Sequence, residues 1–468
     1  HPGPFIWNKI EPTKGVYDFS ETDRYVKAAQ KYGIHIIATI WPYAEWDQKH
    51  WESQSGWKPS RGFEGFLPLS RYKPHDMEAY KAFVKTLVER YDGDGVDDMP
   101  GLKQPIKHWE VINEPEMGFI RPEPLNFFRG SPEDYLEVLK VTYEAIREAD
   151  PEAKVLNGGI AYVPEKLEEW DLFWGKVFKL GGAKYIDILT VHNLNPYLGE
   201  ALERLYSYLG RQGIKKPIWV TELQVAEGIP IPPTGEVLSR EGQAKAIVKA
   251  YLDGFSLNVE KIFYTSYMAF PGGFETLAKS ALIEAGERKP AYYAVKTMVT
   301  LLEGFSRAEK LEENLYRFIL PDKTEVYVVW SGGKLPSNIK GEVLTVTLTG
   351  KANLTDVSTL RLGGEPTYIV KGSREKLESL MLKLREEKQP KIQPPPVSGM
   401  ETVEKPKIGR IDLNGDGRVD YGDLEVLKGV YGLSTGEKRF KPEVDLNGDG
   451  IIDIVDLAIL ACHYGENV

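Results

Sequence analysis

Two short stretches, HWEVINEP at residues 108–115 and PIWVTEL at residues 217–223, decide how this sequence is interpreted. Each stretch is rich in apolar and β-branched residues, which is typical of a buried strand. Each also contains a glutamate, Glu114 or Glu222, at the point where the strand gives way to a loop. The two glutamates lie 108 positions apart (222 − 114). Only a fold that gathers the ends of distant strands can bring them together.

Strand-length apolar runs alternate with amphipathic helical stretches from the start of the chain to about residue 304. This alternation is the pattern of β-α units in a parallel sheet. The candidate strands are 5–7, 36–40, 108–113, 154–157, 187–192, 218–222 and 262–267. The candidate helices are 21–32, 76–91, 132–149, 165–180, 200–212, 239–257 and 290–302. Repeats of this kind favour an eight-fold barrel over an open sheet.

The number of repeats is one short of a complete barrel. We therefore expect the α/β class, with a (β/α)8 TIM barrel over residues 1–304 whose first β-α unit is absent from the chain. The chain opens at His1 without a methionine or a signal peptide, so we expect a mature form or a fragment. When the absent unit is counted as the first, Asn113 ends the fourth strand and Glu222 ends the seventh.

Three further segments follow the predicted barrel. Short alternating strands separated by glycine-rich turns predict a small antiparallel β-domain at residues 305–372. Residues 373–407 begin with apolar side chains at helical spacing and continue as a proline-rich linker. Residues 408–468 form a last module with an internal repeat.

The composition excludes several classes of function. The chain of 468 residues has a formal net charge of −10, which argues against binding nucleic acid, because that binding depends on neutralising phosphates with Lys and Arg. It contains no run of about 18 apolar residues, so no membrane span is expected. A single cysteine, Cys462, excludes an intrachain disulfide.

The last module repeats DLNGDGRVDYGD at 412–423 as DLNGDGIIDIVD at 445–456, an offset of 33 residues (445 − 412). A calcium loop of the EF-hand type places oxygen ligands at positions 1, 3, 5, 7, 9 and 12, with glycine at position 6. Both copies satisfy this pattern, and position 7 contributes only a backbone carbonyl. The predicted ligands are Asp412, Asn414, Asp416, Arg418, Asp420, Asp423, Asp445, Asn447, Asp449, Ile451, Asp453 and Asp456.

Position 12 of each loop is Asp rather than the Glu of ordinary EF-hands, and one helix is expected after each loop, at 424–431 and 457–464. Together these features resemble the dockerin module, over residues 409–465. The resemblance implies Ca²⁺ as the cofactor of this module and a cohesin-type receptor or cell-surface scaffold as its partner, although such a module can also serve other attachment. It implies a secreted or cell-surface location, where calcium is abundant.

The two glutamates fit one kind of chemistry. Glycosidic bond cleavage needs one carboxyl to protonate the leaving oxygen and another to attack or stabilise the anomeric carbon. The segment from Trp109 to Pro115 resembles the acid/base motif of clan A glycoside hydrolases, notably families 39, 5 and 42, whose barrels carry Asn-Glu-Pro at the end of the fourth strand. That clan keeps its nucleophile at the end of the seventh strand. The resemblance implies a retaining enzyme without a catalytic cofactor, with Glu114 as acid/base and Glu222 as nucleophile.

The resemblance also implies contacts to the sugar. Asn113 resembles the clan residue that hydrogen-bonds the sugar 2-hydroxyl, and its alternative is a strand-end amide that caps a loop. His192 ends the sixth strand, where the clan commonly has a residue that contacts the nucleophile; a satisfied buried histidine is the alternative. Tyr197 follows it. Tyr267 ends the eighth strand, where many members have a tryptophan under the sugar.

Aromatic and acidic neighbours complete the candidate site. Trp41 and Trp46 begin an aromatic-rich loop after the third strand, which predicts sugar stacking, with packing of the loop on itself as the alternative. Phe270 or Tyr264 are substitutes for Tyr267 as the sugar platform. The acids that flank Glu114, namely Glu110 and Glu116, are expected to point away from it.

The sequence therefore predicts a retaining β-glycoside hydrolase that acts on a β-linked polysaccharide or oligosaccharide. Aromatics strung along a cleft favour attack within the glycan chain, whereas a closed pocket would favour an exo-acting β-galactosidase or β-xylosidase. A non-catalytic carbohydrate-binding scaffold protein is a further alternative. A metal-dependent barrel hydrolase is disfavoured because the histidines before residue 200 are scattered in sequence. Fold analogy does not identify the sugar.

Overall fold

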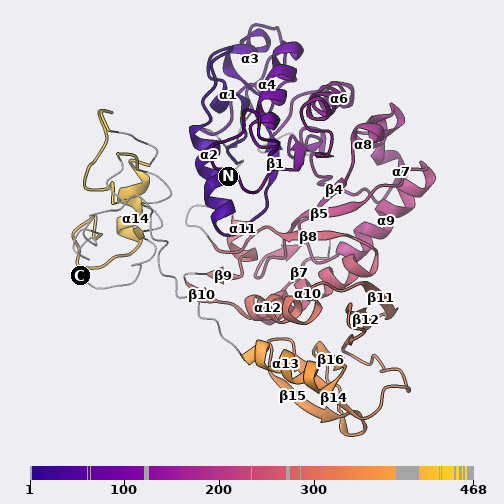
Figure 1. Cartoon of the computed structure of the whole chain (residues 1–468). Helices are drawn as coiled ribbons and strands as arrows, with labels where there is room; N and C mark the ends of the chain where they lie inside the picture. The colour runs from indigo at the N-terminus through magenta and orange to yellow at the C-terminus, as the bar shows by residue number, and fades with distance from the viewer. Residues whose placement is uncertain are drawn as a thin grey trace. The chain divides into compact units, whose positions relative to one another are not determined.

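The computed structural model describes residues 3–60, 62–63, 65–120, 126–232, 234–269, 275–284, 286–385, 411–431, 433, 435–446, 450–452, 456 and 459–460. The chain divides into two compact units, His1–Glu386 and Glu387–Val468 (Figure 1). The predicted barrel, the predicted β-domain and the helix that follows them belong to the first unit.

The first unit is built on parallel strands that follow one another in chain order. They form two three-stranded sheets, β1-β2-β3 and β4-β5-β8, and every pairing within them is parallel. Single bridges from Leu156 to Ile188 and from Ile160 to Val191 connect the two sheets. This order agrees with the predicted α/β class. The strands are β1 Ile37–Ile40, β2 His108–Val111, β3 Lys154–Leu156, β4 Leu189–Asn193, β5 Ile218–Leu223 and β8 Lys261–Tyr264.

The first predicted strand is replaced by a helical turn. Only Ile6 of residues 5–7 forms a bridge, beside the end of β1. From there the chain enters helix α1 (Trp7–Ile10), because the Trp7 Nε1–H donates to Glu11 Oε2 at 2.6 Å and fixes the turn. Among the described residues, β5 is the only strand of this sheet that pairs with β8. The predicted eight-fold barrel therefore stays a prediction.

Helices alternate with these strands (Figure 1). Helix α6 starts where the sequence predicts it, because Ser131 accepts a hydrogen bond from the Asp134 N–H and Asp134 accepts one from the Ser131 N–H. The predicted helix at 165–180 is interrupted, and the Trp170 ring at the interruption stacks on Tyr208 at 4.0 Å. The longer helices are α2 Ser20–Lys31, α3 Glu45–Glu52, α4 Met77–Glu89, α6 Pro132–Ala149, α9 Leu198–Arg211, α10 Arg240–Ser256 and α12 Pro290–Leu302. The shorter ones are α5 Met117–Ile120, α7 Leu167–Trp170, α8 Trp174–Lys179 and α11 Glu275–Ser280.

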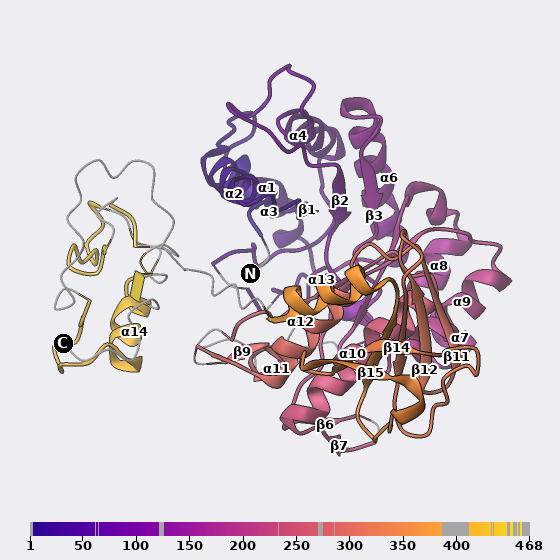
Figure 2. The same ribbon diagram turned by 60° about the horizontal axis from the view of Figure 1, so that its bottom comes forward.

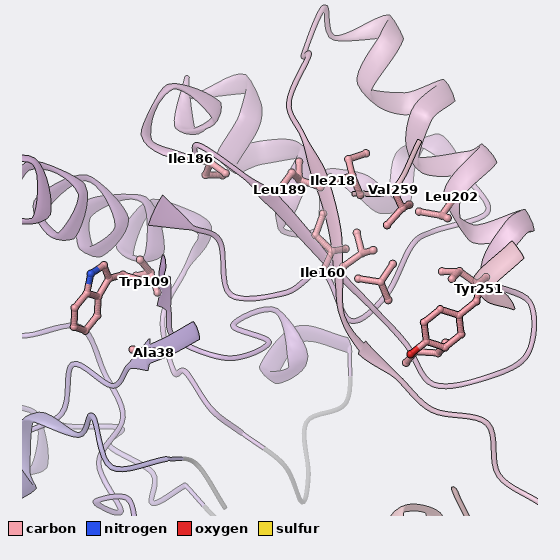
Figure 3. Packing of buried hydrophobic residues seen from close by; sticks show 14 of the residues in the cluster. Ala38, Trp109, Ile160, Ile186, Leu189, Leu202, Ile218, Tyr251 and Val259 are labelled. Carbon is pink, nitrogen blue, oxygen red and sulfur yellow. The ribbon is translucent and has the colours of Figure 1, made fainter. Parts of the chain in front are cut away.

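Buried apolar side chains from strands and helices form the main core of this unit, beside two smaller clusters. Figure 3 shows Ile218 of β5 close to Leu202 of α9 and to Val259. Burial of a side chain of this size contributes roughly 1.5–3 kcal/mol. The core therefore fixes the strand ends on which the candidate site is built.

An antiparallel sheet with the order β11-β12-β13-β16-β14-β15 lies in the stretch where the sequence predicts a small β-domain. Asp253 of α10, which is buried, joins this sheet to the helices: it accepts hydrogen bonds from Tyr316 at 2.5 Å and Lys310 at 3.1 Å. Helix α13 packs against α12 (Figure 2). The elements are β11 Arg307–Glu312, β12 Leu315–Ile319, β13 Glu325–Val329, β14 Glu342–Thr347, β15 Ala352–Asp356, β16 Thr367–Lys371 and α13 Arg374–Arg385.

The second unit is described in part. Helix α14 (Tyr421–Lys428) starts with a capping box between Asp420 and Asp423. A small apolar core gathers around it, and it includes Ile411, Val419, Leu427, Val444 and Ile452. The predicted ligands Asn447, Asp449 and Asp453, and most of the second predicted helix, lie outside the described residues. In neither unit do the described helices include one that is both long and apolar enough to cross a membrane.

Candidate active site

The two glutamates meet at the carboxyl ends of the parallel strands. Glu222 lies in β5, and Glu114 follows β2 by three residues. The register of β4 against β5 places His192 opposite Glu222. One carboxylate oxygen of each glutamate and one ring nitrogen of His192 all lie within 4.8 Å of one another. The fold thus brings together two side chains that are far apart in sequence.

The backbone that presents Glu114 is strained. Ile112 and Glu114 have φ angles of 62° and 42°, in the left-handed region that β-branched Ile rarely adopts. The Glu114 N–H donates to the carbonyl of Gly158, in the loop after β3. A Cβ on Gly158 would lie 2.7 Å from the Ile112 carbonyl oxygen, so only glycine allows this approach. Strain of this kind collects at functional sites.

His192 lies against the acid rather than the expected nucleophile. Its Nδ1 is 2.8 Å from Glu114 Oε1 and 3.9 Å from Glu222 Oε1. The family resemblance implies a contact with the nucleophile, but the hydrogen bond goes to Glu114, although the register of β4 against β5 places His192 opposite Glu222. Gly159 has a φ of +67°, and a Cβ there would lie 2.1 Å from His192 Nε2. The imidazole can therefore occupy this position only if residue 159 is a glycine.

The Asn157-Gly158-Gly159 segment is not among the predicted site residues, although its glycine pair directly follows a predicted strand. Asn157 fixes the segment to β4, because its Nδ2 donates to the Thr190 carbonyl at 3.1 Å and its Oδ1 accepts from the Thr190 N–H. A glycine pair at a strand end, where backbone must approach closely, is the signal that could have found it.

The charges of the site explain the protonation of His192. The ring is buried, and burial alone would lower its pKa. The carboxylates of Glu222, Glu114 and Glu110 reverse this effect and raise the pKa of His192 to about 10. Burial also raises the pKa of the Glu222 carboxyl, and the His192 charge opposes that rise. The His192 ring is therefore protonated, and its Nδ1–H donates to Glu114 Oε1 at 2.8 Å.

The prediction that Glu110 points away from the site is wrong. Glu110 lines the same cavity as the two glutamates, and its Oε2 accepts a hydrogen bond from Thr39 Oγ1 at 2.8 Å. Glu110 precedes Glu114 by four residues, and side chains an even number of positions apart along a strand share one face, so Glu110 faces the interior together with Glu114. Glu116 turns elsewhere, and its Oε1 accepts from the Ala161 N–H at 2.6 Å.

A cavity of about 1090 Å³ surrounds these carboxyls. Trp41, Phe63 and Phe127 contribute aromatic rings to one wall, with centroids 5.8 Å apart for Trp41 and Phe127. The segment Ile229–Pro232, which includes strand β6 (Pro230–Ile231), contributes an apolar wall. The cavity also extends to helix α2 and to Phe263 of β8. Its volume therefore exceeds that of the substrate space around the glutamates.

Of the predicted substrate contacts, Asn113, His192 and Trp41 line this cavity together with Glu114 and Glu222. The three groups Glu114, His192 and Glu222 are also arranged so that they could hold a metal ion. The prediction of catalysis without a cofactor therefore stays a prediction.

The other predicted contacts, Trp46, Tyr197 and Tyr267, do not line the cavity of the described residues. The Trp46 ring packs against Trp7 at 5.0 Å. The Tyr197 hydroxyl donates to Glu236 at 3.2 Å, on the hairpin strand β7 (Glu236–Val237).

Tyr267 is 59% exposed and lies three residues beyond the end of β8, so it has left the strand that would have aimed it inward. Tyr264, one proposed substitute, donates its hydroxyl to the Ser280 carbonyl at 2.7 Å. The other, Phe270, lies outside the described residues.

The calcium loops of the second unit repeat one hydrogen-bond pattern. The N–H of Gly417 donates to Asp412 Oδ2, as that of Gly450 does to Asp445 Oδ2, each at 2.9 Å. The Leu413 and Leu446 N–H groups likewise donate to Asp423 and Asp456, each at 2.6 Å. The backbone thus turns the ligand carboxylates inward in both copies. Clustered carboxylate and amide oxygens fit a hard cation such as Ca²⁺.

Residues 410–463 match the dockerin type I domain. The C-terminal segment is a dockerin type I domain. Domains of this family bind calcium and cohesins. The match confirms the predicted dockerin-like module, and the donor set of the loops fits the ion.

Solved structures similar to this chain include glycoside hydrolases. A glucosidase from Croceicoccus marinus is 14% identical, with a TM-score of 0.52, and the match covers 77% of this chain and 84% of that chain. BuGH86wt, solved in complex with neoagarooctaose, is 14% identical with a TM-score of 0.50, covering 77% of this chain and 66% of that chain. A conserved exported protein from Bacteroides fragilis is 13% identical with a TM-score of 0.50, covering 76% and 81%. Likeness at this identity shows a shared fold.

A curated relative is the β-galactosidase bgaB of Geobacillus kaustophilus, which is 25% identical over 240 residues. The match covers 40% of this chain and 34% of that relative, so the chain spans about a third of the relative's length. The predicted resemblance to clan A glycoside hydrolases is confirmed at the level of a glycoside hydrolase-like fold.

Gly159→Ala should displace the His192 ring, because the new methyl group would overlap the imidazole. We expect the Nδ1 to Glu114 Oε1 distance in a crystal structure of the variant to exceed about 3.5 Å, beyond hydrogen-bonding range. Gly181→Ala is the matched control, since Gly181 has a φ of +87° but open space around its Cα. A Gly159→Ala variant with the His192 contact intact would contradict this account.

Calcium should order the dockerin domain. Calorimetric titration of the full chain should yield about two bound ions, and Asp412→Asn or Asp445→Asn should each remove one. Chelation should unfold the segment, because the clustered carboxylates then repel one another. Asp322→Asn, in an exposed turn of the first unit, serves as control. A chelator that leaves the fold of residues 411–460 unchanged, measured by amide hydrogen exchange, would rule out this assignment of the loops.

Proposed function

We propose that this chain is a retaining β-glycoside hydrolase that cleaves β-linked polysaccharide or oligosaccharide, with Glu114 as acid/base and Glu222 as nucleophile. The observation that carries the proposal is the approach of their carboxylate oxygens to within 4.8 Å. Retaining enzymes hold the two carboxyls about 5–5.5 Å apart, whereas inverting enzymes need about 6.5–9.5 Å to admit a water. The close spacing supports direct attack by Glu222.

In the first step Glu222 attacks the anomeric carbon while Glu114 gives a proton to the glycosidic oxygen. The proton comes from the one that Glu114 and His192 hold between them at 2.8 Å. The bond between the anomeric carbon and the leaving oxygen breaks, and an ester to Glu222 forms. The leaving group departs as a neutral alcohol.

In the second step water attacks the same carbon, and the ester bond to Glu222 breaks. Glu114, now a carboxylate, takes the proton from the water. This proton restores the hydrogen-bonded pair of Glu114 and His192 to its starting state. The sugar leaves with its original configuration, since two inversions have occurred.

The cavity lining supports specific contacts to the glycan. Asn113 lies beside Glu114 and is proposed to hydrogen-bond the sugar 2-hydroxyl. Trp41, with Phe63 and Phe127, offers flat apolar surface on which a sugar ring can stack. Trp46, Tyr197 and Tyr267 have no place in this proposal, because they do not line the described cavity.

The dockerin domain is proposed to attach the enzyme to a cohesin-type receptor or cell-surface scaffold outside the cell. Calcium would hold the loops that present helix α14 and its repeat. This arrangement keeps the hydrolase near its insoluble or high-molecular-weight substrate. Such tethering raises the local concentration of enzyme without any change in the active site.

A second candidate is an exo-acting β-galactosidase, and the similarity to the β-galactosidase of Geobacillus kaustophilus favours it. Both candidates use the same two glutamates. Product analysis on a long β-glycan separates them: attack within the chain releases a series of oligosaccharides, whereas exo action releases monosaccharide alone.

Glu222→Gly should abolish hydrolysis of aryl β-glycosides, by roughly 10⁴-fold or more in kcat. Added azide should restore turnover by filling the space of the lost carboxylate, and the product should be a glycosyl azide of inverted configuration. Glu114→Ala should lose activity most on substrates with poor leaving groups, which need the proton. Glu313→Gly, an exposed substitution in the turn between β11 and β12, is the control. Full activity in either active-site variant would contradict the assignment of Glu114 and Glu222 as the catalytic residues.

A further inference from the structure

Glu110 lies in the catalytic cavity but has no part in the proposed displacement. Its side chain is 5% exposed, and one oxygen, Oε2, accepts a hydrogen bond from Thr39. The other oxygen, Oε1, is buried and has no hydrogen-bond partner among the described residues. Burial of a carboxyl oxygen without a hydrogen-bond partner lowers the stability of the fold, so each such group needs an explanation.

We propose that Glu110 is a positioning residue whose charge sets how strongly Glu114 and His192 hold the proton that they share. The proposal rests on the proposed function only for its consequence in catalysis. The geometric basis is that Glu110, Glu114, His192 and Glu222 line one cavity. Three carboxyls, those of Glu110, Glu114 and Glu222, thus share this space with the His192 imidazole.

The groups that face Glu110 come from each neighbouring element. Thr39 lies on β1, His192 on β4 and Glu222 on β5, and the Tyr135 hydroxyl of α6 also feels the Glu110 charge. Burial raises the pKa of Glu110 to about 7, with His192 and Thr39 opposing the rise and Glu222 and Glu114 adding to it. Glu110 is thus neutral in mild acid and anionic in mild alkali.

The sign of the effect follows from this titration. Above pH 7 the ionised Glu110 adds a negative charge near His192, which strengthens the hold on the shared proton. The acid then keeps its proton to higher pH than two carboxylates alone would allow. Removal of the Glu110 charge should therefore lower the pKa of His192 and move the alkaline limb of activity to lower pH.

A purely structural role predicts a different result. If Glu110 only supports β1 through Thr39, its replacement would change stability and leave the titration of His192 in place. Glu116 offers a matched control. It is also buried, follows the same strand closely in sequence and has a pKa that burial likewise raises to about 7, but it does not line the cavity.

The decisive experiment is an NMR titration of the His192 imidazole in the full chain. Glu110→Gln should lower its pKa by about 0.5–1 unit, whereas Glu116→Gln should shift it by less than about 0.2 unit. Glu110→Asp keeps the charge and should restore most of the wild-type value. Glu110→Leu gives a second neutral variant should Glu110→Gln fold poorly. An unchanged His192 pKa in the neutral variants, or an equal shift in Glu116→Gln, overturns the proposal.

The pH profile of kcat/KM on an aryl β-glycoside supplies the catalytic readout. The alkaline limb should move to lower pH in Glu110→Gln by the amount seen in the NMR titration, and it should stay in place in Glu116→Gln. A wild-type chain that cleaves no glycoside would defeat the proposed function, while the NMR titration would still decide the role of Glu110. An NMR shift without a shifted limb would overturn the catalytic part.

Discussion

The short contact between His192 and Glu114, beside a second carboxylate on Glu222, is the interaction on which the rest of this site depends. Two carboxylates this close repel each other in a buried cavity, and a cation between them offsets that repulsion. The imidazole supplies both the positive charge and the mobile proton. Without it, burial would drive the Glu222 carboxyl toward the neutral form, and attack by Glu222 could not operate as proposed.

Several features of the backbone around the site make the contact between His192 and Glu114 possible. Gly159 leaves the space that the His192 ring fills, and Gly158 lets the loop after β3 reach the strained turn at Ile112. The irregular β4–β5 register brings His192 level with Glu222. Strain at Ile112 and Glu114 is tolerated because buried apolar side chains on β2 and its neighbours hold the strand in place. The antiparallel sheet contributes through Asp253, far along the chain, by bracing helix α10.

The sequence allows the parallel strands and the two glutamates to be predicted, because buried parallel strands appear as continuous apolar runs and each ends in an acid. The calcium loops can be predicted for a similar reason, since their ligand spacing is fixed by local backbone geometry. The direction of Glu110 could have been predicted, because strand alternation places positions 110 and 114 on one face. The exposed position of Tyr267 depends on where β8 ends. The partner of His192 depends on how the turn after β2 brings Glu114 beside β4, which no local pattern records.

The stereochemistry of the first product tests the central claim most directly. Proton NMR of the reaction mixture in the first minutes of aryl β-glycoside hydrolysis distinguishes the two anomers before they equilibrate in water. Direct attack by Glu222 across the short carboxyl separation predicts that the β-anomer appears first. Initial release of the α-anomer would show a single inversion by water, and would contradict the assignment of Glu222 as nucleophile.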